Sequence, residues 1–231
     1  MKAVFPDVEA VIFDMDGLVL DTETTYFIAW QHAAMRMGYV LPDEFCRSLS
    51  GLHFKQVSEM ILAYCGQDFS LDHFNQISGE IWRDQVRDQG IPVKKGFFSL
   101  LDVITQLNLP FCLATNSLLA NALECLDLAK LTHLFTTIIS REMSVNPKPA
   151  PDLFIKASEL LAVPIGRCLV LEDSLSGVMA AVKAGGIAVY VPSQTPLDKR
   201  AEFLADFNAI DLDRVARMLA DKFTYSSFDR L

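Results

Sequence analysis

The sequence predicts an α/β protein built on a doubly wound parallel sheet, with a small helical domain inserted directly after the first strand. Short apolar runs alternate with segments of helical period from residue 95 to residue 191, as parallel sheets require. Between residues 21 and 94, in contrast, apolar residues recur at helical spacing without a convincing strand. We therefore expect a core of residues 1–20 and 95–231, interrupted by a helical domain of residues 21–94.

The first strand is expected at residues 11–13, an apolar run that ends in two acids one residue apart, Asp14 and Asp16, before Gly17. Alternate side chains of a strand share a face, so both carboxylates should point the same way at its carboxyl end. Two like charges this close repel each other unless a divalent cation neutralises them or one carboxyl stays protonated. Taken alone, this pattern is equally typical of a solvated strand end.

The inserted segment contains four stretches of helical period. Glycines end three of them, as is common for helices, and Ser70 can cap the start of the last. The stretches span residues 22–38, 42–50, 57–66 and 70–90.

The rest of the chain alternates between the two kinds of element, which is the pattern of a doubly wound sheet. Apolar runs predict strands at residues 111–114, 137–139, 168–171 and 187–191. Helical periods predict helices at residues 97–107, 118–126, 151–161 and 178–184, and a last amphipathic helix after residue 211.

Polar residues follow several of these strands, at the end of an open α/β sheet where ligands bind. Three prolines flank a lysine in a further loop and stiffen it, which would hold that lysine in one place. The candidate residues are Asp14, Asp16, Thr115, Asn116, Lys148, Glu172 and Asp173. Taken singly, Thr115 and Asn116 could belong to a helix cap, Lys148 could lie on the surface, and the acids could lie in solvated loops. Their common position at strand ends and in a loop favours a shared site.

Together these residues have the chemistry that phosphoryl transfer needs. The Thr115 hydroxyl, the Asn116 backbone N–H and the Lys148 ammonium can donate to phosphoryl oxygens. An ionised Asp14 can attack phosphorus and form an aspartyl phosphate. Asp16 can protonate the leaving alcohol and later deprotonate the hydrolytic water.

The same acids suit a magnesium ion. Mg²⁺ prefers oxygen ligands, and Asp14, Asp173 and Glu172, with a backbone carbonyl from Asp16, could supply them. We therefore expect Mg²⁺ as the cofactor.

Composition narrows the class of partner. The formal net charge is −9 and no run is rich in Lys or Arg, which disfavours nucleic acids and anionic membranes. The five cysteines are scattered without metal-ligand spacing, as in a reducing compartment. No signal segment and no membrane span are visible. We expect a cytoplasmic monomer that acts on a small phosphorylated metabolite.

The motifs resemble those of the haloacid dehalogenase superfamily of phosphohydrolases, in the subfamily with a helical cap after the first motif. The resemblance spans residues 8–191 and implies a Rossmann-like core, Mg²⁺, an aspartyl-phosphate intermediate, and a cap that opens and closes. The motifs are Asp14-Met15-Asp16-Gly17, Thr115-Asn116-Ser117, Lys148-Pro149-Ala150-Pro151-Asp152, and Glu172-Asp173-Ser174 with Gly177.

Within this family the sequence favours hydrolysis of a sugar phosphate or nucleoside phosphate, as in the pseudouridine-5′-phosphatases and 2-deoxyglucose-6-phosphatases. The alternative is a phosphosugar isomerase of the β-phosphoglucomutase type. In that branch a histidine stands where this chain has Tyr26, and an arginine follows the cap-loop glycine, where Gly51 is followed by Leu52-His53-Phe54-Lys55. A phosphorylated signalling module is a third possibility, disfavoured by Asp16 and the helical insert. Substrate choice is expected to depend on the 51–56 loop and the helix from Glu23.

Overall fold

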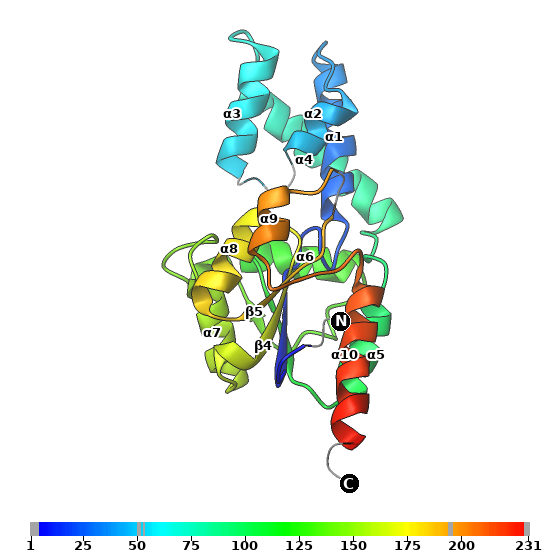
Figure 1. Cartoon of the computed structure of the whole chain (residues 1–231). Coiled ribbons are helices and arrows are strands. Elements are labelled where there is room, and N and C mark those ends of the chain that lie inside the picture. The colour runs from blue at the N-terminus through cyan, green and yellow to red at the C-terminus, as the bar shows by residue number, and fades with distance from the viewer. Residues whose placement is uncertain (1–4, 50–51, 53, 194–195, 229–231) are drawn as a thin grey trace. The chain divides into compact units, whose positions relative to one another are not determined.

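The computed structural model describes residues 5–49, 52, 54–193 and 196–228, so Gly51 and His53 of the expected substrate loop lie outside the described residues. The chain divides into two compact units (Figure 1). The larger comprises Met1–Leu20 and Val93–Leu231, and the smaller comprises Asp21–Pro92.

The larger unit is built on a six-stranded sheet of order β3-β2-β1-β4-β5-β6, in which every neighbouring pair is parallel. This confirms the predicted doubly wound fold. The strands are β1 (Ala10–Phe13), β2 (Phe111–Ala114), β3 (Ile138–Ile139), β4 (Cys168–Glu172), β5 (Ile187–Tyr190) and β6 (Phe207–Asn208). The sequence did not predict β6, because Phe207 and Asn208 form no apolar run, whereas the equally short β3 consists of two isoleucines.

Strand β1 lies at the centre of the sheet, and all four of its residues are buried. The chain runs from β1 outward through β2 and β3, and then returns to the other side of β1 to form β4. Strand order therefore reverses between β1 and β4, which is where open α/β sheets bind their ligands. Phe13 pairs with Leu113 of β2 and Leu171 of β4, so the three strands end nearly level.

Helices cover both faces of the sheet. They are α5 (Phe97–Gln106), α6 (Leu119–Leu128), α7 (Asp152–Leu161), α8 (Leu175–Ala184), α9 (Lys199–Leu204) and α10 (Leu212–Phe228), with 3₁₀ turns η1 (Arg141–Met143) and η2 (Ile165–Arg167). Helices α5 and α10 pack together, as do α7 and α8, and Figure 1 shows the two pairs on opposite sides of the sheet. The six-residue helix α9 was not predicted, because it is too short to show a clear period.

The aromatic side chain of Phe13 fixes the end of β1. Its ring meets those of Phe97, Phe111 and Phe135 in edge-on contacts, with centroids 5.7, 6.2 and 6.0 Å away. Such contacts add to the free energy of burial and restrict the ring to one position. The residue that follows, Asp14, is therefore attached to a rigid strand end.

The smaller unit is helical in its described residues and has its own apolar core. Its helices are α1 (Thr22–Arg36), α2 (Asp43–Ser48), α3 (Phe54–Cys65) and α4 (Leu71–Gln89). Helices α1 and α4 pack together, and the Tyr26 ring of α1 stacks on Trp82 of α4 with centroids 5.1 Å apart. The indole N–H of Trp82 donates to the hydroxyl of Thr25, which pins the pair of helices.

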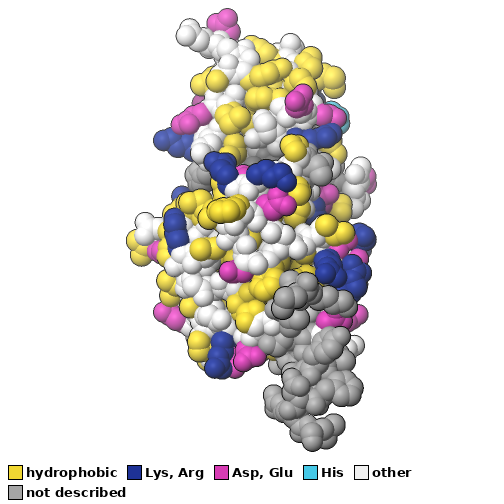
Figure 2. All heavy atoms as spheres, in the orientation of Figure 1, with side chains coloured by type: hydrophobic (Ala, Val, Ile, Leu, Met, Phe, Trp, Pro, Cys, Tyr) yellow, Lys and Arg dark blue, Asp and Glu magenta, His cyan; other side chains and the backbone are white. Residues whose placement is uncertain are grey.

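Over the described residues, each helix is either too short or too polar to cross a lipid bilayer. On the face drawn in Figure 2, basic side chains lie among acidic ones.

Two glycines of the larger unit allow a test of how closely the start of α10 packs against Gly96. Gly96, before α5, and Gly185, after α8, have nearly equal φ angles of 86° and 82°. A Cβ on Gly96 would lie 2.1 Å from the Asp213 backbone nitrogen at the start of α10, whereas a Cβ on Gly185 would meet no atom within 4 Å.

We expect Gly185→Ala to lower the free energy of unfolding by about 1 kcal/mol, which is the backbone penalty alone. Gly96→Ala should cost a further ~1–3 kcal/mol, because α10 must move away. Urea unfolding of both variants measures the difference. Equal losses would show that α10 is not held against Gly96.

Candidate active site

Three buried carboxylates gather where β1 and β4 end. Asp14 follows β1, Glu172 is the last residue of β4, and Asp173 comes next; one oxygen of each lies within 4.8 Å of the others. Phe13 and Leu171 are paired neighbours, which places Asp14 beside the end of β4. Three largely buried acids at one point repel one another unless positive charge lies nearby or one carboxyl is protonated.

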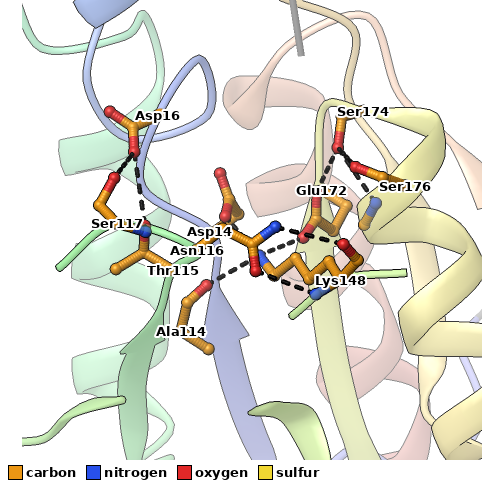
Figure 3. Close-up of polar contacts among 11 residues, drawn as sticks. Asp14, Asp16, Ala114, Thr115, Asn116, Ser117, Lys148, Glu172, Ser174 and Ser176 are labelled. Atoms are coloured by element: carbon orange, nitrogen blue, oxygen red, sulfur yellow. Dashed lines mark hydrogen bonds and ion pairs between the residues drawn. The ribbon is translucent and has the colours of Figure 1, made fainter. Parts of the chain in front are cut away.

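Lys148 supplies one positive charge to this acidic triad. Its ammonium donates to Asp14 Oδ1, to Glu172 Oε1 at 2.6 Å and to the Ala114 backbone carbonyl at 2.9 Å (Figure 3). A lysine ammonium has three N–H groups, so these three acceptors use all of them. The ammonium also lies 4.8 Å from the ring centroid of Phe154, a favourable cation–π position.

Burial and charge act in opposite directions on the titration of these groups. Burial raises the pKa of Asp14 to about 7, although Lys148 opposes the shift. Burial would lower the pKa of Lys148, but Asp14 and Glu172 hold it above its usual range. Lys148 therefore keeps its proton at neutral pH.

The donor set fits a divalent cation. With all three carboxylates ionised, the acids and the one ammonium would carry two net negative charges in a buried place. A doubly charged cation would balance them, and carboxylate oxygens are the ligands that Mg²⁺ prefers.

Two glycines make room for the acids. Gly17 has a φ of +84°, and a Cβ there would lie 2.0 Å from Asp173 Oδ2. A Cβ on Gly177 would lie 1.8 Å from Glu172 Oε2. Any larger residue at either position would displace a carboxylate, so these glycines shape the triad.

Asp16 has partners of its own. Strand β1 ends at Phe13, so Asp14 and Asp16 do not occupy alternate positions of one strand, and the expected sharing of a strand face does not apply. The Asp16 carboxylate accepts from the hydroxyls of Ser117 at 2.9 Å and Thr115 at 3.4 Å. Figure 3 shows its side chain turned toward the end of β2, apart from Asp14. Among the described residues, the group of acids close enough to share a metal contains Asp14, Glu172 and Asp173; a metal contact from Asp16 through its carbonyl stays a prediction.

The two predicted phosphate donors after β2 also lie in this region. Thr115 is buried, and its hydroxyl accepts from the Ser117 N–H at 3.0 Å. Asn116 directs its carboxamide to the main chain of Lys148, with Oδ1 accepting from the Lys148 N–H at 2.9 Å. All seven predicted residues therefore lie at the ends of β1, β2 and β4 or in the loop that carries Lys148.

The sequence reasoning missed three contacts of this site. Ser117 holds Asp16, Ser174 donates to Glu172 Oε2 at 3.3 Å, and the Ala114 carbonyl accepts from Lys148. Ser117 follows Asn116 and Ser174 follows Asp173, so their place beside candidate residues inside the quoted motifs was an available signal. A backbone carbonyl has no such signal.

The comparisons with known proteins agree with the fold. The sequence pattern described as haloacid dehalogenase-like hydrolase matches residues 11–191. The chain belongs to this family of hydrolases.

The chain is similar to relatives of more than one activity. A phosphorylated carbohydrates phosphatase of Thermotoga maritima is 30% identical over 182 residues, which cover 79% of this chain and 84% of that protein. A β-phosphoglucomutase of Bacillus subtilis is 28% identical over 197 residues, covering 82% and 85%. The crystal structure of a family IA HAD hydrolase from Entamoeba histolytica superposes with a TM-score of 0.74 at 25% identity, covering 92% of this chain and all of that one (100%).

The role of Lys148 as counter-charge can be tested by stability. We expect Lys148→Met, without divalent cations, to lower the free energy of unfolding by about 3 kcal/mol, because buried carboxylates lose their partner. The matched control is Lys183→Met in α8, an exposed lysine that donates to the Pro149 carbonyl of the same loop. It should cost less than about 1 kcal/mol. Similar losses in urea unfolding would contradict the assignment.

Proposed function

We propose that the chain is a phosphatase that hydrolyses a small phosphomonoester, either a sugar phosphate or a nucleoside phosphate, through an aspartyl phosphate on Asp14. The observation that carries the proposal is the buried contact of Asp14 with Lys148 beside Glu172 and Asp173. The similarity to a phosphatase of phosphorylated carbohydrates supports it.

Substrate binding uses donors from two elements. The Thr115 hydroxyl and the Asn116 backbone N–H lie at the end of β2, where they can donate to phosphoryl oxygens. The Lys148 ammonium already donates three hydrogen bonds, so one of them must turn to the phosphoryl group when substrate enters. Binding therefore releases one of the three acceptors that Lys148 now contacts, which are Asp14, Glu172 and the Ala114 carbonyl.

The reaction then proceeds in two displacements. An Asp14 oxygen attacks phosphorus, the bond from phosphorus to the ester oxygen breaks, and Asp16 gives its proton to the leaving alkoxide. A water then attacks the aspartyl phosphate, Asp16 takes the proton of that water, and Asp14 is released with inorganic phosphate. Ser117 holds the Asp16 carboxylate during both steps, while the Thr115 hydroxyl exchanges Asp16 for a phosphoryl oxygen when substrate binds.

Asp14, Glu172 and Asp173, with a backbone carbonyl from Asp16, would hold Mg²⁺ in this scheme. When bound, the ion would neutralise charge on the carboxylates and on the phosphoryl oxygens.

We propose in addition that residues 1–20 and 95–231 form the catalytic domain and that residues 21–94 act as a cap that opens for substrate and closes for chemistry. Hydrolysis is favoured over a mutase reaction because Tyr26 replaces the histidine of the mutase branch. The Tyr26 ring is stacked on Trp82 and Trp30, so it contributes to the packing of its own unit.

Turnover of a substrate panel tests the class of reaction. We expect the full chain with Mg²⁺ to release phosphate from p-nitrophenyl phosphate and from some members of a panel of sugar phosphates and nucleoside monophosphates. EDTA should remove the activity and added Mg²⁺ should restore it. No turnover of any substrate by folded protein would contradict the proposal. Conversion of β-glucose 1-phosphate to glucose 6-phosphate faster than phosphate release would establish the mutase instead.

The nucleophile is tested by Asp14→Asn. This change keeps the shape of the side chain but removes the attacking charge, so kcat should fall by at least about 10³-fold. Asp102→Asn on an exposed position of α5 is the control and should keep full activity. Circular dichroism checks that both variants fold. Near-normal turnover by Asp14→Asn would mean that another group attacks.

A further inference from the structure

The carboxamide of Asn116 binds both main-chain polar groups of Lys148. Its Oδ1 accepts from the Lys148 N–H at 2.9 Å, and its Nδ2 donates to the Lys148 carbonyl at 3.4 Å. The two residues stand 32 positions apart in the chain and meet in Figure 3. A carboxamide has a donor and an acceptor side by side, so it pairs with a backbone as a neighbouring strand would.

Lys148 needs such a partner because its loop has no regular structure. Residues 144–151 belong to no helix or strand, and the Ala150 N–H donates to the Pro147 carbonyl at 2.9 Å, which closes a turn around Lys148. Neighbouring contacts hold the loop elsewhere: the Asn146 N–H donates to Asp152, and Lys183 donates to the Pro149 carbonyl. Asn116 acts on the backbone of Lys148 itself.

The other end of the lysine side chain is held by the same strand end. The ammonium donates to the carbonyl of Ala114, two residues before Asn116. The end of β2 therefore binds Lys148 at its backbone and at its charge. Fixing both ends of a long, flexible side chain restricts the rotamers that could carry the ammonium away from the acids.

We propose that the Asn116 carboxamide is a positioning residue that places the Lys148 ammonium between Asp14 and Glu172. The proposal rests on the proposed function, in which Asn116 reaches the phosphoryl group only through its backbone N–H, and it gives the side chain a separate task. A reacting group must be held within about 0.5 Å of its working position. Prolines stiffen the loop, and the Asn116 carboxamide in addition joins the Lys148 backbone to the end of β2.

A double-mutant cycle on stability tests this without relying on catalysis. Asn116→Ala, Lys148→Met and the double variant are unfolded in urea as full-length protein without divalent cations. The quantity compared is the fold-change in the unfolding equilibrium constant that Lys148→Met causes. If Asn116 places the ammonium, this fold-change should be at least about threefold smaller in the Asn116→Ala background than in the parent. If Asn116 only anchors the loop, the two changes will be additive, and the proposal fails.

Kinetics give the second arm of the experiment. Asn116→Ala should lower kcat/KM for p-nitrophenyl phosphate by at least about tenfold and should add little to the loss caused by Lys148→Met. The matched control is Asn121→Ala, the same change at an exposed position of α6, which should leave kcat/KM and the urea midpoint near those of the parent. A full additional loss in the Lys148→Met background would show that Asn116 acts on substrate directly, which overturns the proposal.

The two arms separate the failure of this inference from the failure of the proposed function. Coupled stabilities with no phosphatase activity would uphold the positioning of Lys148 and refute the phosphatase. Should Asn116→Ala not fold, Asn116→Asp, which keeps the acceptor for the Lys148 N–H, replaces it in the same cycle.

Discussion

The buried ammonium of Lys148 is the constraint on which the rest of this site depends. Its side chain is 3% exposed, and the acids that it contacts are buried as well. An unpaired charge in such a place would destabilise the fold strongly, whereas a charge with every hydrogen bond made is tolerated. Within the described part of the chain, every fully buried side-chain nitrogen and oxygen has a hydrogen-bond partner. The acids and the lysine therefore depend on each other for burial.

The parallel sheet brings these groups together with little help from side chains. Because β1 pairs in register with β2 and β4, the residues after the three strands emerge at one edge. Asp14, Thr115 and Glu172 meet there because each stands at the end of its strand. Gly17 and Gly177 then leave the space that the carboxylates of Asp173 and Glu172 occupy. The fold therefore determines where the carboxylates lie, and the two glycines allow them to approach the backbone closely.

This division explains what the sequence could predict. Strands and helices of ordinary length have periods of their own, so the doubly wound sheet and the strand-end residues were readable from local pattern. Strand β6 was missed because it contains no apolar run, and the short α9 was missed because it shows no clear period. The separate partners of Asp14 and Asp16 were missed because the rule that alternate side chains share a face was applied beyond Phe13, where the strand ends. The contacts of the Asn116 carboxamide cross 32 residues of sequence, and no local signal marks them.

In the proposed reaction, the phosphoryl group must compete with the present acceptors for the N–H groups of Lys148. Burial raises the pKa of Asp14 to about 7, and the contact with Lys148 favours the ionised form that can attack phosphorus. Yet the three N–H groups of Lys148 are already used by Asp14, Glu172 and Ala114. Any bond to a phosphoryl oxygen must take the place of one of these.

The bond to the Ala114 carbonyl is the one whose exchange would leave both ion pairs intact. It joins the ammonium to a neutral acceptor, whereas the other two join it to carboxylates, and charge-assisted bonds are the stronger kind. Exchange at that position would let Lys148 reach the phosphoryl group while still stabilising the ionised Asp14. The ammonium would then no longer be bound to the Ala114 carbonyl of β2. The hydrogen bonds between Asn116 and the Lys148 main chain would therefore matter more for the position of the lysine. The placement of the lysine by two independent contacts from β2 is consistent with a group that must exchange one partner without losing its position.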